Sequence, residues 1–481
     1  MGLVTPIDPV PVGQLGTVHF TGIGGAGMSG IARIMLARGI TVSGTDSAAS
    51  GLLDELAAAG ARVHVGHAAE HLGDADTLVV STAIRPDNPE LAEAQRRGLR
   101  VMHRAAALAS LMLGYQGIAV AGTHGKTTTT SMITTVLVHC GAQPSYVIGG
   151  ILAQTGLGAA QGEGRFFVAE ADESDGSFLM LAPDAAVVTS VEADHLDNYG
   201  TLAAVRKAFT AFAGRISAGG LLLACADDPG ALALLDATGP DITALTYGTA
   251  GGASYRLGDI RPLGMRTALT VTGGPGTVLA EAGPVQLEIA VPGRHNALNA
   301  AAAFGLTVEL GVSVADAVAG LAAYRGARRR LELKGEADGV QVIDSYAHHP
   351  TELAADLAAA RDIAGSADGG GGRVIAVFQP HLFSRTRIFA AEFGAVLGQA
   401  DEAIVLDVYA AREDPEPGVT GRLVADAVPG GALFLPDKAS VPAVLAGLAK
   451  PGDLVLTMGA GDVTTLGPQI VAALRDRAGD R

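Results

Sequence analysis

The chain has 481 residues, of which 48% are hydrophobic and 17% charged, so it can bury a large apolar core and is not intrinsically disordered. Its length favours about three domains. Its 66 glycines follow no G-X-Y period, which excludes a collagen-like chain. The net charge of −16 and the aromatic content of 4% argue against a general nucleic-acid-binding protein.

No apolar window reaches the roughly 20 residues needed to span a bilayer. The first residues lack the basic and apolar regions of a signal peptide. Cys140 and Cys225 lie in apolar stretches, without the spacing of a disulfide framework or a zinc site. We therefore expect a soluble cytoplasmic protein with neither a membrane nor a nucleic acid as partner.

Short aliphatic runs alternate with longer alanine- and leucine-rich segments of helical period, which is typical of α/β folds with buried parallel strands. We divide the chain into domains at 1–115, 116–325 and 326–481. The predicted strands are, in chain order, 17–21, 40–43, 77–81, 118–121, 166–169, 185–191, several short runs in 247–291, 340–344, 373–378, 402–407 and 453–458. A helix is predicted over 28–38.

The first glycine cluster follows the first predicted strand and precedes this helix. Gly22, Gly24 and Gly27 form a G-x-G-x-x-G pattern, and Asp46 follows at about the distance of an acid in dinucleotide-binding folds. Glycines there let the backbone approach a pyrophosphate at a helix N-terminus. A tight turn without a ligand is the alternative. The pattern indicates a diphosphate without specifying a nicotinamide cofactor.

A second cluster, Gly122-Thr-His-Gly-Lys-Thr-Thr128, follows the strand 118–121 and opens a helix. Val120 stands where the first glycine of the common phosphate-loop template belongs, but the Gly125-Lys126-Thr127 part is present. Backbone N–H groups, a lysine and a threonine hydroxyl are the groups that hold nucleotide phosphates and Mg²⁺. The sequence therefore predicts a triphosphate site here.

Acids follow two further strands of this block. Glu170 follows the strand 166–169, and Asp172, Glu173 and Asp175 come close behind; an acid at such a strand end is where a nucleoside triphosphatase holds magnesium. The run 192–197 places His195 among carboxylates after the strand 185–191, so a second magnesium site is a hypothesis and a solvated acidic loop the alternative.

The third block carries two histidine-bearing loops, each between a strand and a helix. One contains Asp344, Tyr346 and His348; the other contains His381 and Arg385. Two such loops at the carboxyl ends of parallel strands favour a binding site. Upstream, Asn296 opens a helix and could serve only as its N-cap, while the arginines at 328–330 could clamp phosphate or be a solvated basic run.

Taken together and in order, these motifs resemble the Mur ligase family, the ATP-dependent amino-acid ligases of peptidoglycan synthesis. The resemblance runs from about Gly16 to Asp462. Within the family, the run Glu173-Ser-Asp-Gly-Ser-Phe178 and the stretch at His103-Arg104 favour the member that joins L-alanine to UDP-N-acetylmuramate. The alternative within the family is a ligase for the recycled tripeptide L-Ala-γ-D-Glu-meso-diaminopimelate.

The resemblance implies an N-terminal Rossmann-like domain for the UDP-sugar, a central ATPase domain with a phosphate loop, and a C-terminal Rossmann-like domain that binds the amino acid and closes for catalysis. It implies ATP and Mg²⁺ as cofactors. The metal would meet Thr127, Glu170 and His195, and the catalytic residues would be Lys126, His348 and Arg385.

The resemblance also assigns ligand contacts. Those implied for ATP are Gly122, Thr123, His124, Gly125, Lys126, Thr127, Thr128, His295, Asn296, Arg329 and Asp344. Those implied for the UDP-sugar are Gly24, Gly25, Ala26, Gly27, Met28, Ser29, Asp46, Ser81, Thr82, His103 and Arg104. Those implied for the amino acid are Tyr346, His348, His381 and Arg385.

Three positions depart from the family pattern. Ser345 stands where a second acid usually follows Asp344, Leu382 stands where an arginine often follows His381, and Thr189-Ser190 replaces a common Thr-Asn. Arg385 would then carry more of the amino-acid recognition. Two other classes stay open from the residues alone: a nicotinamide oxidoreductase using the first glycine loop, and a nucleotide-binding regulatory module without ligase activity.

Overall fold

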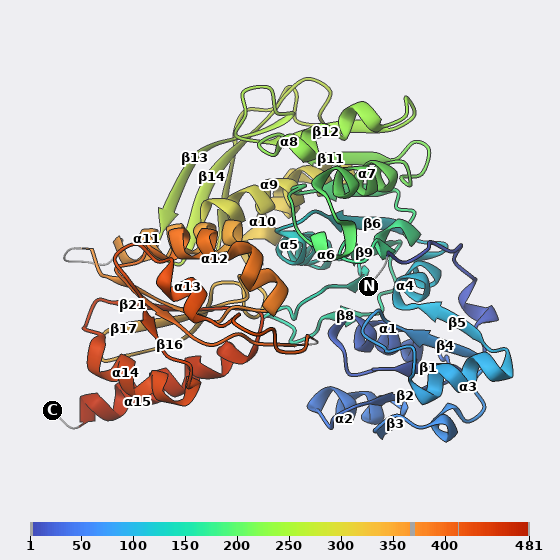
Figure 1. Ribbon diagram of the computed structural model, residues 1–481. Helices are drawn as coiled ribbons and strands as arrows, with labels where there is room; N and C mark the ends of the chain where they lie inside the picture. Colours follow the sequence, from blue (N-terminus) through green and yellow to red (C-terminus); the bar gives the residue numbers. More distant parts are fainter. Residues whose placement is uncertain (1–2, 366–370, 412, 480–481) are drawn as a thin grey trace. The chain divides into compact units, whose positions relative to one another are not determined.

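The computed structural model describes residues 3–365, 371–411 and 413–479, and it confirms the α/β class with three sheets (Figure 1). The chain packs as two compact units. The first comprises the residues up to 258, 270–286 and 298–324, and the second comprises 259–269, 287–297 and 325 onward. Among the described residues, no helix is both long and apolar enough to cross a bilayer.

The first sheet has the order β3-β2-β1-β4-β5 and its strands pair in parallel. Because the order reverses between β1 and β4, the loops after these strands leave a crevice at the carboxyl edge, where α/β sheets bind ligands. The strands are β1 (Val18–Thr21), β2 (Val42–Asp46), β3 (Arg62–Val65), β4 (Thr77–Val80) and β5 (Arg100–His103). The helices are α1 (Ala26–Ala37), α2 (Gly51–Ala58), α3 (Pro89–Arg97) and α4 (Arg104–Met112).

The second sheet has ten strands in the order β15-β14-β13-β12-β11-β10-β6-β9-β7-β8. Its centre is parallel and aliphatic, as the continuous apolar runs predicted. The strands are β6 (Gln116–Ala121), β7 (Ser145–Val147), β8 (Ala159–Ala160), β9 (Phe166–Glu170), β10 (Ala185–Val188), β11 (Leu221–Cys225), β12 (Thr243–Gly248), β13 (Tyr255–Leu263), β14 (Arg266–Gly273) and β15 (Val285–Ile289). The helices are α5 (Lys126–His139), α6 (Leu196–Tyr199), α7 (Leu202–Ala213), α8 (Pro229–Leu232), α9 (Arg294–Glu309) and α10 (Val314–Ala323).

Two predicted strands differ from the observed ones by three residues at one end, and the other individually predicted strands agree to within two residues. The strand expected at 40–43 is β2, which extends to Asp46. The strand expected at 185–191 ends at Val188, because Thr189 and Ser190 bond to the second glycine loop: Thr189 donates to the His124 carbonyl, and the Ser190 hydroxyl accepts from the His124 N–H at 3.1 Å.

The third sheet has the order β16-β17-β21-β18-β19-β20 and is parallel except for the β16–β17 hairpin. The strands are β16 (Glu332–Ala337), β17 (Val340–Ser345), β18 (Val374–Phe378), β19 (Glu402–Val405), β20 (Leu433–Phe434) and β21 (Leu454–Met458). The helices are α11 (Pro350–Gly365), α12 (Phe383–Leu397), α13 (Arg422–Asp426), α14 (Val441–Leu448) and α15 (Leu466–Gly479).

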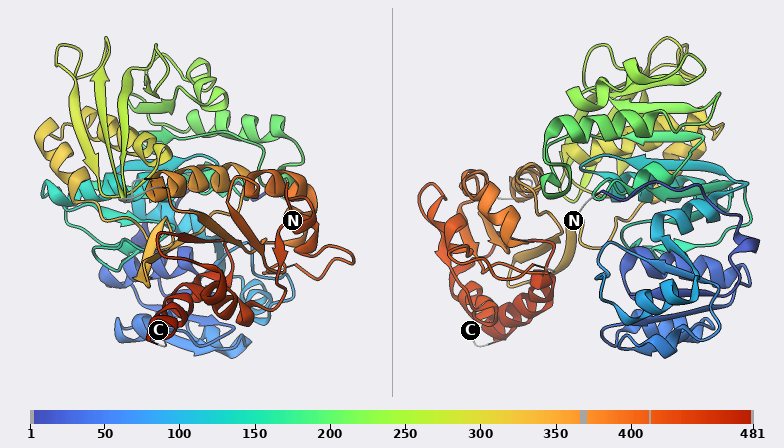
Figure 2. Two further views of the ribbon diagram at one scale, coloured as in Figure 1. Left: turned by 90° about the vertical axis from the view of Figure 1, so that its left-hand side faces the viewer. Right: turned by 45° about the vertical axis from the view of Figure 1, so that its right-hand side comes forward.

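Two hydrophobic cores cover the two faces of this third sheet. One contains Ile343, Ala376 and Phe378 with the apolar faces of α11, α12 and α13. The other contains Val342 and Val377 with α14 and α15, so helices cover both faces of the sheet (Figure 2). Neighbouring residues of one strand, such as Val342 and Ile343, therefore point to opposite faces. The helices thereby leave the strand ends and their loops as the place for polar side chains.

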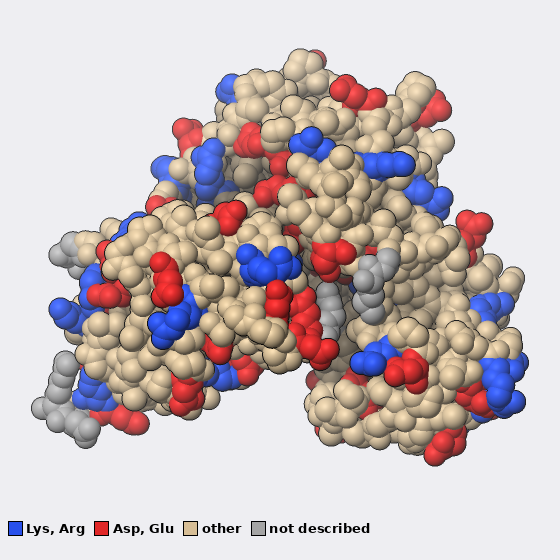
Figure 3. Space-filling model, in the orientation of Figure 1, with Lys and Arg blue, Asp and Glu red and all other residues tan. Residues whose placement is uncertain are grey.

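Charged side chains are mixed over the surface. On the face drawn in Figure 3, the lysines and arginines of the described residues are scattered among acidic side chains. This distribution matches the acidic composition of the chain.

Gly44 provides a test of the packing below the first glycine loop. A Cβ at Gly44 would lie 2.7 Å from the Phe20 carbonyl oxygen and 2.8 Å from the Ile23 Cβ. We expect Gly44→Ala to destabilise the protein by about 1–3 kcal/mol through overpacking, measured by thermal unfolding. Gly51→Ala, at a position where a Cβ would meet nothing within 4 Å, is the control. Equal melting temperatures for the two variants would contradict this packing.

Candidate active site

The second glycine loop turns between β6 and α5 in a conformation that requires glycine. Gly122 and Gly125 have φ values of +137° and +80°. A Cβ at Gly122 would lie 2.0 Å from the Thr189 hydroxyl, and one at Gly125 would lie 2.6 Å from the Asn299 side-chain oxygen. The loop leads directly into the amino end of α5, where backbone N–H groups and the helix dipole favour an anion.

Lys126, the first residue of α5, is held at this loop by three acceptors. Its Nζ donates to the carbonyl oxygens of Gly122 at 2.6 Å and Thr123 at 3.2 Å, and to the Glu173 carboxylate at 2.9 Å. The side chains of Lys126 and Glu173 are 14% and 2% exposed. Burial alone would lower the pKa of Lys126, but Glu173 and its acidic neighbours outweigh burial and raise this pKa, so the ammonium stays charged.

The carboxylate of Glu170, at the end of β9, lies beside the next residue of the same helix. It accepts from the Thr127 hydroxyl at 3.1 Å and from the Gly149 N–H at 2.8 Å. A hydroxyl and a carboxylate are oxygen donors of the kind that Mg²⁺ prefers. The predicted ligands Thr127 and Glu170 are therefore brought together, and their donor set fits magnesium.

His195, the third predicted metal ligand, lies against Glu173. Its Nε2 is 3.8 Å from a Glu173 oxygen and 3.6 Å from the Asp194 carboxylate. Its φ of 52° is left-handed, and it stands at the N-cap position of α6. Glu173 thus lies between the histidine and the Lys126 ammonium.

The first glycine loop is hydrogen-bonded to an acidic side chain at the end of β2. The N–H of Gly24 donates to the Asp46 carboxylate at 2.9 Å. Because β1, β2, β4 and β5 are parallel, their carboxyl ends meet at one edge. This edge carries the residues predicted for the UDP-sugar: Gly24, Gly25, Ala26, Gly27, Met28 and Ser29 around the start of α1, Asp46 at the end of β2, Ser81 and Thr82 after β4, and His103 and Arg104 at the β5–α4 junction.

An ion pair joins this edge to the acidic segment of the second sheet, within the first unit. Arg104 donates to the Asp172 carboxylate at 2.6 Å, and the His103 Nε2 lies 3.5 Å from the Asp175 carboxylate. Burial would raise the pKa of Asp172, but Arg104 and then Lys126 outweigh it, and the pKa is lowered. The acidic segment 172–175 therefore contacts basic groups of the predicted UDP-sugar site and of the predicted ATP site.

In the second unit, the loops after β17 and β18 bring together the residues predicted for the amino acid. The Tyr346 and His348 rings are 5.3 Å apart, and the His348 and His381 rings are 6.0 Å apart. Arg385 lies in the first turn of α12 and is 8% exposed. Leu382, which departs from the family pattern, has a φ of +70° and is nearly buried.

The Nδ1 of His348 faces two acceptors, the Tyr346 carbonyl oxygen at 3.0 Å and the Glu352 carboxylate at 3.3 Å. Neither oxygen can donate, so Nδ1 carries the ring hydrogen and Nε2 is the basic nitrogen. His348 is thereby oriented in the way a general base requires.

Arg329 and Asp344, both predicted to contact ATP, are engaged with their own domain. Arg329 donates to the carbonyl oxygens of Gly459 at 2.5 Å and Gly461 at 3.0 Å. Asp344 is fully buried, and its two oxygens accept from the hydroxyls of Thr457 at 2.8 Å and Thr464 at 2.7 Å. The Asp344 Oδ2 also lies 3.5 Å from the Arg329 Nε, so Asp344 anchors that arginine.

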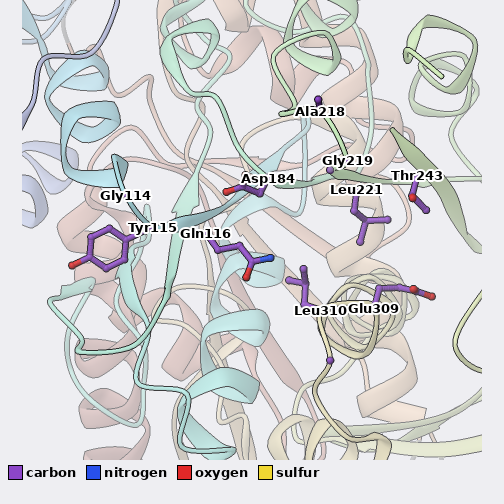
Figure 4. Close-up of a pocket in the computed structure, with 12 residues that line it drawn as sticks. Gly114, Tyr115, Gln116, Asp184, Ala218, Gly219, Leu221, Thr243, Glu309 and Leu310 are labelled. Atoms are coloured by element: carbon purple, nitrogen blue, oxygen red, sulfur yellow. The ribbon is translucent and has the colours of Figure 1, made fainter. Parts of the chain in front are cut away.

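A cavity of about 760 Å³ lies elsewhere, at the amino ends of β6, β11 and β12 (Figure 4). Its lining includes Tyr115, Gln116, Asp184, Gly219, Thr243 and Glu309. The glycine loop and Lys126 are at the carboxyl end of β6, so this cavity is distinct from the phosphate site.

The loop and its buried lysine define a nucleotide-binding α/β protein. Three family models match in order along the chain: the Mur ligase family catalytic domain over 17–116, the Mur ligase middle domain over 120–307, and the Mur ligase glutamate ligase domain over 329–461. The chain belongs to the Mur ligase family.

Two curated relatives carry the name UDP-N-acetylmuramate–L-alanine ligase. The one from Thermobifida fusca is 57% identical over 98% of this chain and 100% of its own length. The one from Kineococcus radiotolerans is 56% identical over 97% of this chain and 98% of its own. A crystal structure of the UDP-N-acetylmuramate–alanine ligase of Thermotoga maritima, 27% identical, superposes with a TM-score of 0.79 over 96% of this chain and 99% of that one.

Reasoning from the sequence missed several residues of this site. Glu173 stood in the acidic run without an assigned role, and only the fold shows that it is the partner of Lys126. Asn299, three residues after Asn296, accepts from the Thr129 hydroxyl at 3.2 Å below the loop, and no role was predicted for it. The Asp172–Arg104 pair joins residues 68 positions apart, and no local pattern signals such a pair.

The buried Lys126–Glu173 pair can be tested by stability. Lys126→Met should lower the melting temperature markedly, because an unpaired buried carboxylate costs about 3–5 kcal/mol. Lys126→Met combined with Glu173→Gln should recover most of that loss, since neither position of the pair then carries a charge. Arg96→Met, which removes an arginine from a surface pair with Glu93, is the control and should leave the melting temperature almost unchanged. A double variant no more stable than the single one would contradict the pairing.

Proposed function

We propose that the protein joins L-alanine to the lactyl carboxylate of UDP-N-acetylmuramate, consumes ATP and releases UDP-N-acetylmuramoyl-L-alanine, ADP and phosphate in the cytoplasm. One observation carries the proposal: the full-length similarity to relatives that bear this name, in a chain that presents the Lys126 phosphate loop. The small-molecule partners are then the UDP-sugar and the amino acid.

In this proposal each of the three domains binds one substrate. Residues 1–115 bind the UDP-sugar at the carboxyl edge of the first sheet, residues 116–325 bind ATP, and residues 326–481 bind the amino acid. The parallel strands of the three sheets support this division, because most of the assigned residues, though not Arg329, follow the carboxyl ends of strands.

The chain's own groups would hold the triphosphate at the amino end of α5. Backbone N–H groups of the loop Gly122–Gly125 and the Lys126 ammonium supply positive potential in a place of low solvent exposure, where it counts most. Thr127 and Glu170 would hold Mg²⁺, with His195 close to the same acidic segment. The ion, when bound, neutralises phosphate charge.

The reaction has two steps. A lactyl carboxylate oxygen attacks the γ-phosphorus of ATP, the bond to the bridging oxygen breaks, and ADP leaves with an acyl phosphate formed. The amine of L-alanine then attacks the acyl carbon, phosphate leaves with the C–O bonding electrons, and the amide nitrogen loses a proton. Lys126 stabilises the charge that develops in the first step.

His348 is the proposed acceptor of that proton. Its Nε2 is basic because Nδ1 is held by the Tyr346 carbonyl and Glu352. Asp344 is less suited, since it is fully buried and both of its oxygens already accept hydrogen bonds. Arg385, Tyr346 and His381 would frame the carboxylates of the amino acid and the sugar.

The reaction is tested by following ADP release from Mg-ATP in the presence of UDP-N-acetylmuramate and one acceptor at a time. We expect release that depends on both the UDP-sugar and L-alanine. Release with L-Ala-γ-D-Glu-meso-diaminopimelate but not with L-alanine would assign the recycling reaction instead. ATP binding without release with any acceptor would favour the regulatory module.

The role of His348 is tested by His348→Gln, which keeps a polar side chain but has no basic nitrogen. We expect kcat to fall by about 10²- to 10⁴-fold, the usual worth of general acid–base catalysis, with the Kd for ATP unchanged. Glu352→Gln, which weakens the orientation of the ring, should give a smaller loss. A kcat within twofold of the wild-type value for His348→Gln would overturn the assignment.

A further inference from the structure

A buried carboxyl group in the second unit lies next to a residue that the proposed function assigns to the nucleotide. Asp356 is in the second turn of α11, and its residue is 8% exposed. Its Oδ2 accepts a short hydrogen bond from the Ser345 hydroxyl, and its Oδ1 lies 3.6 Å from the His295 Nε2. Three separate elements, β17, α9 and α11, thus bring one group each to this point.

The His295 ring is fixed from its other side by a glycine. Gly293 has a φ of +100°, and a Cβ there would lie 2.7 Å from the His295 Cε1 and 2.9 Å from its Nδ1. The imidazole therefore occupies the space over the Gly293 backbone. The ring is held by Gly293 and Asp356. Part of it still faces solvent, since the His295 side chain is 31% exposed.

Ser345 connects this cluster to the loop that follows β17. Its hydroxyl donates to Asp356 and accepts from the Ala347 N–H at 3.0 Å. The same residue therefore sets the position of the Asp356 carboxyl group and the start of the loop that carries His348.

We propose that Asp356, held by Ser345, is a positioning residue for ATP binding that fixes the ring orientation and the tautomer of His295. The proposal rests on the proposed function, because it takes His295 as a nucleotide contact. A neutral carboxyl group would donate its hydrogen to Nε2, 3.6 Å away, and leave the ring hydrogen on Nδ1. An ionised carboxylate accepts from Nε2–H instead and leaves Nδ1 as an acceptor.

The groups around Asp356 place the loss of its proton near neutral pH. Burial raises the pKa of Asp356 to about 7; Glu352 also raises it, and Ser345 and Arg330 oppose the shift. Burial, with a smaller effect of Arg330, lowers the pKa of His295 to about 4, so the ring itself is neutral. The charged and titratable groups that act on Asp356 are then Glu352 on its own helix, Arg330 before β16 and His295 on α9.

The test measures ATP binding directly by calorimetry between pH 6 and 8.5. For the wild-type protein we expect the Kd for ATP to rise by about 2- to 10-fold as the pH is raised across this range, with a midpoint near pH 7. This factor corresponds to one hydrogen bond. Asp356→Asn, whose amide donates to Nε2 at every pH, should keep the low-pH Kd throughout. Asp356→Ala should raise the Kd by a similar factor at pH 6.5. Asp362→Asn, at an exposed acid of the same helix, is the control.

Ser345→Ala gives a second, independent readout. Since the Ser345 hydroxyl lowers the pKa of Asp356, its removal should move the midpoint of the Kd profile to higher pH. A merely structural role of Asp356 predicts no such displacement.

Stability supplies a check that does not depend on ATP. Because Asp356 in the folded protein retains a proton that the unfolded chain releases above pH 4, its contribution to the wild-type stability should fall as pH rises from about 4 to about 7. The melting temperature of Asp356→Asn relative to wild type should rise over that range. Flat, superimposable Kd profiles for wild type and Asp356→Asn would overturn the inference, whereas absence of ATP binding in the wild type would overturn the proposed function.

Discussion

The charge on Lys126 is the constraint on which the central site depends. An ammonium that is 14% exposed at the start of α5 is stable only because Glu173 and two backbone carbonyl groups accept from it. That requirement brings the end of β9 and the segment after it against the glycine loop, and the same stretch supplies Glu170 to Thr127 and Asp172 to Arg104. The position of one buried cation thus organises the phosphate loop, the candidate metal ligands and the link to the first sheet.

Three of the candidate binding groups, one for each of three loops, already have an acidic partner from the chain itself. The Gly24 N–H bonds to Asp46, Lys126 bonds to Glu173, and Arg104 bonds to Asp172. Anionic ligands at these places would exchange one negative partner for another. Such an exchange keeps buried cations paired at every stage, which avoids the high cost of an uncompensated buried charge.

The sequence predicted the elements and the loops well, and it predicted the long-range pairs poorly. Gly122, Gly125 and Lys126 were recognisable because a phosphate loop is a local pattern between a strand and a helix. The strand after Asp184 was predicted too long, because its apolar run continues past the point where Thr189 and Ser190 turn to bond the His124 backbone. Periodicity does not encode such a side-chain contact.

The difference between local patterns and long-range contacts also explains what the sequence predicted for Arg329, Asp344 and Asp356. The resemblance implies that the first two contact a nucleotide, which remains a prediction; no local pattern predicted their bonds to Gly459, Gly461, Thr457 and Thr464 in distant parts of the same domain. Asp356 gave no signal, since one acid within a helix is ordinarily exposed. Only the packing of α11 against β17 buries it beside Ser345.

The central claim is that ATP activates the carboxylate of the sugar nucleotide as an acyl phosphate. It is tested most directly by preparing UDP-N-acetylmuramate with ¹⁸O in the lactyl carboxylate and analysing the released phosphate by mass spectrometry after reaction with Mg-ATP and L-alanine. The account predicts that one labelled oxygen per turnover appears in inorganic phosphate, because the attacking carboxylate oxygen leaves with it. Unlabelled phosphate accompanying amide formation would contradict the account.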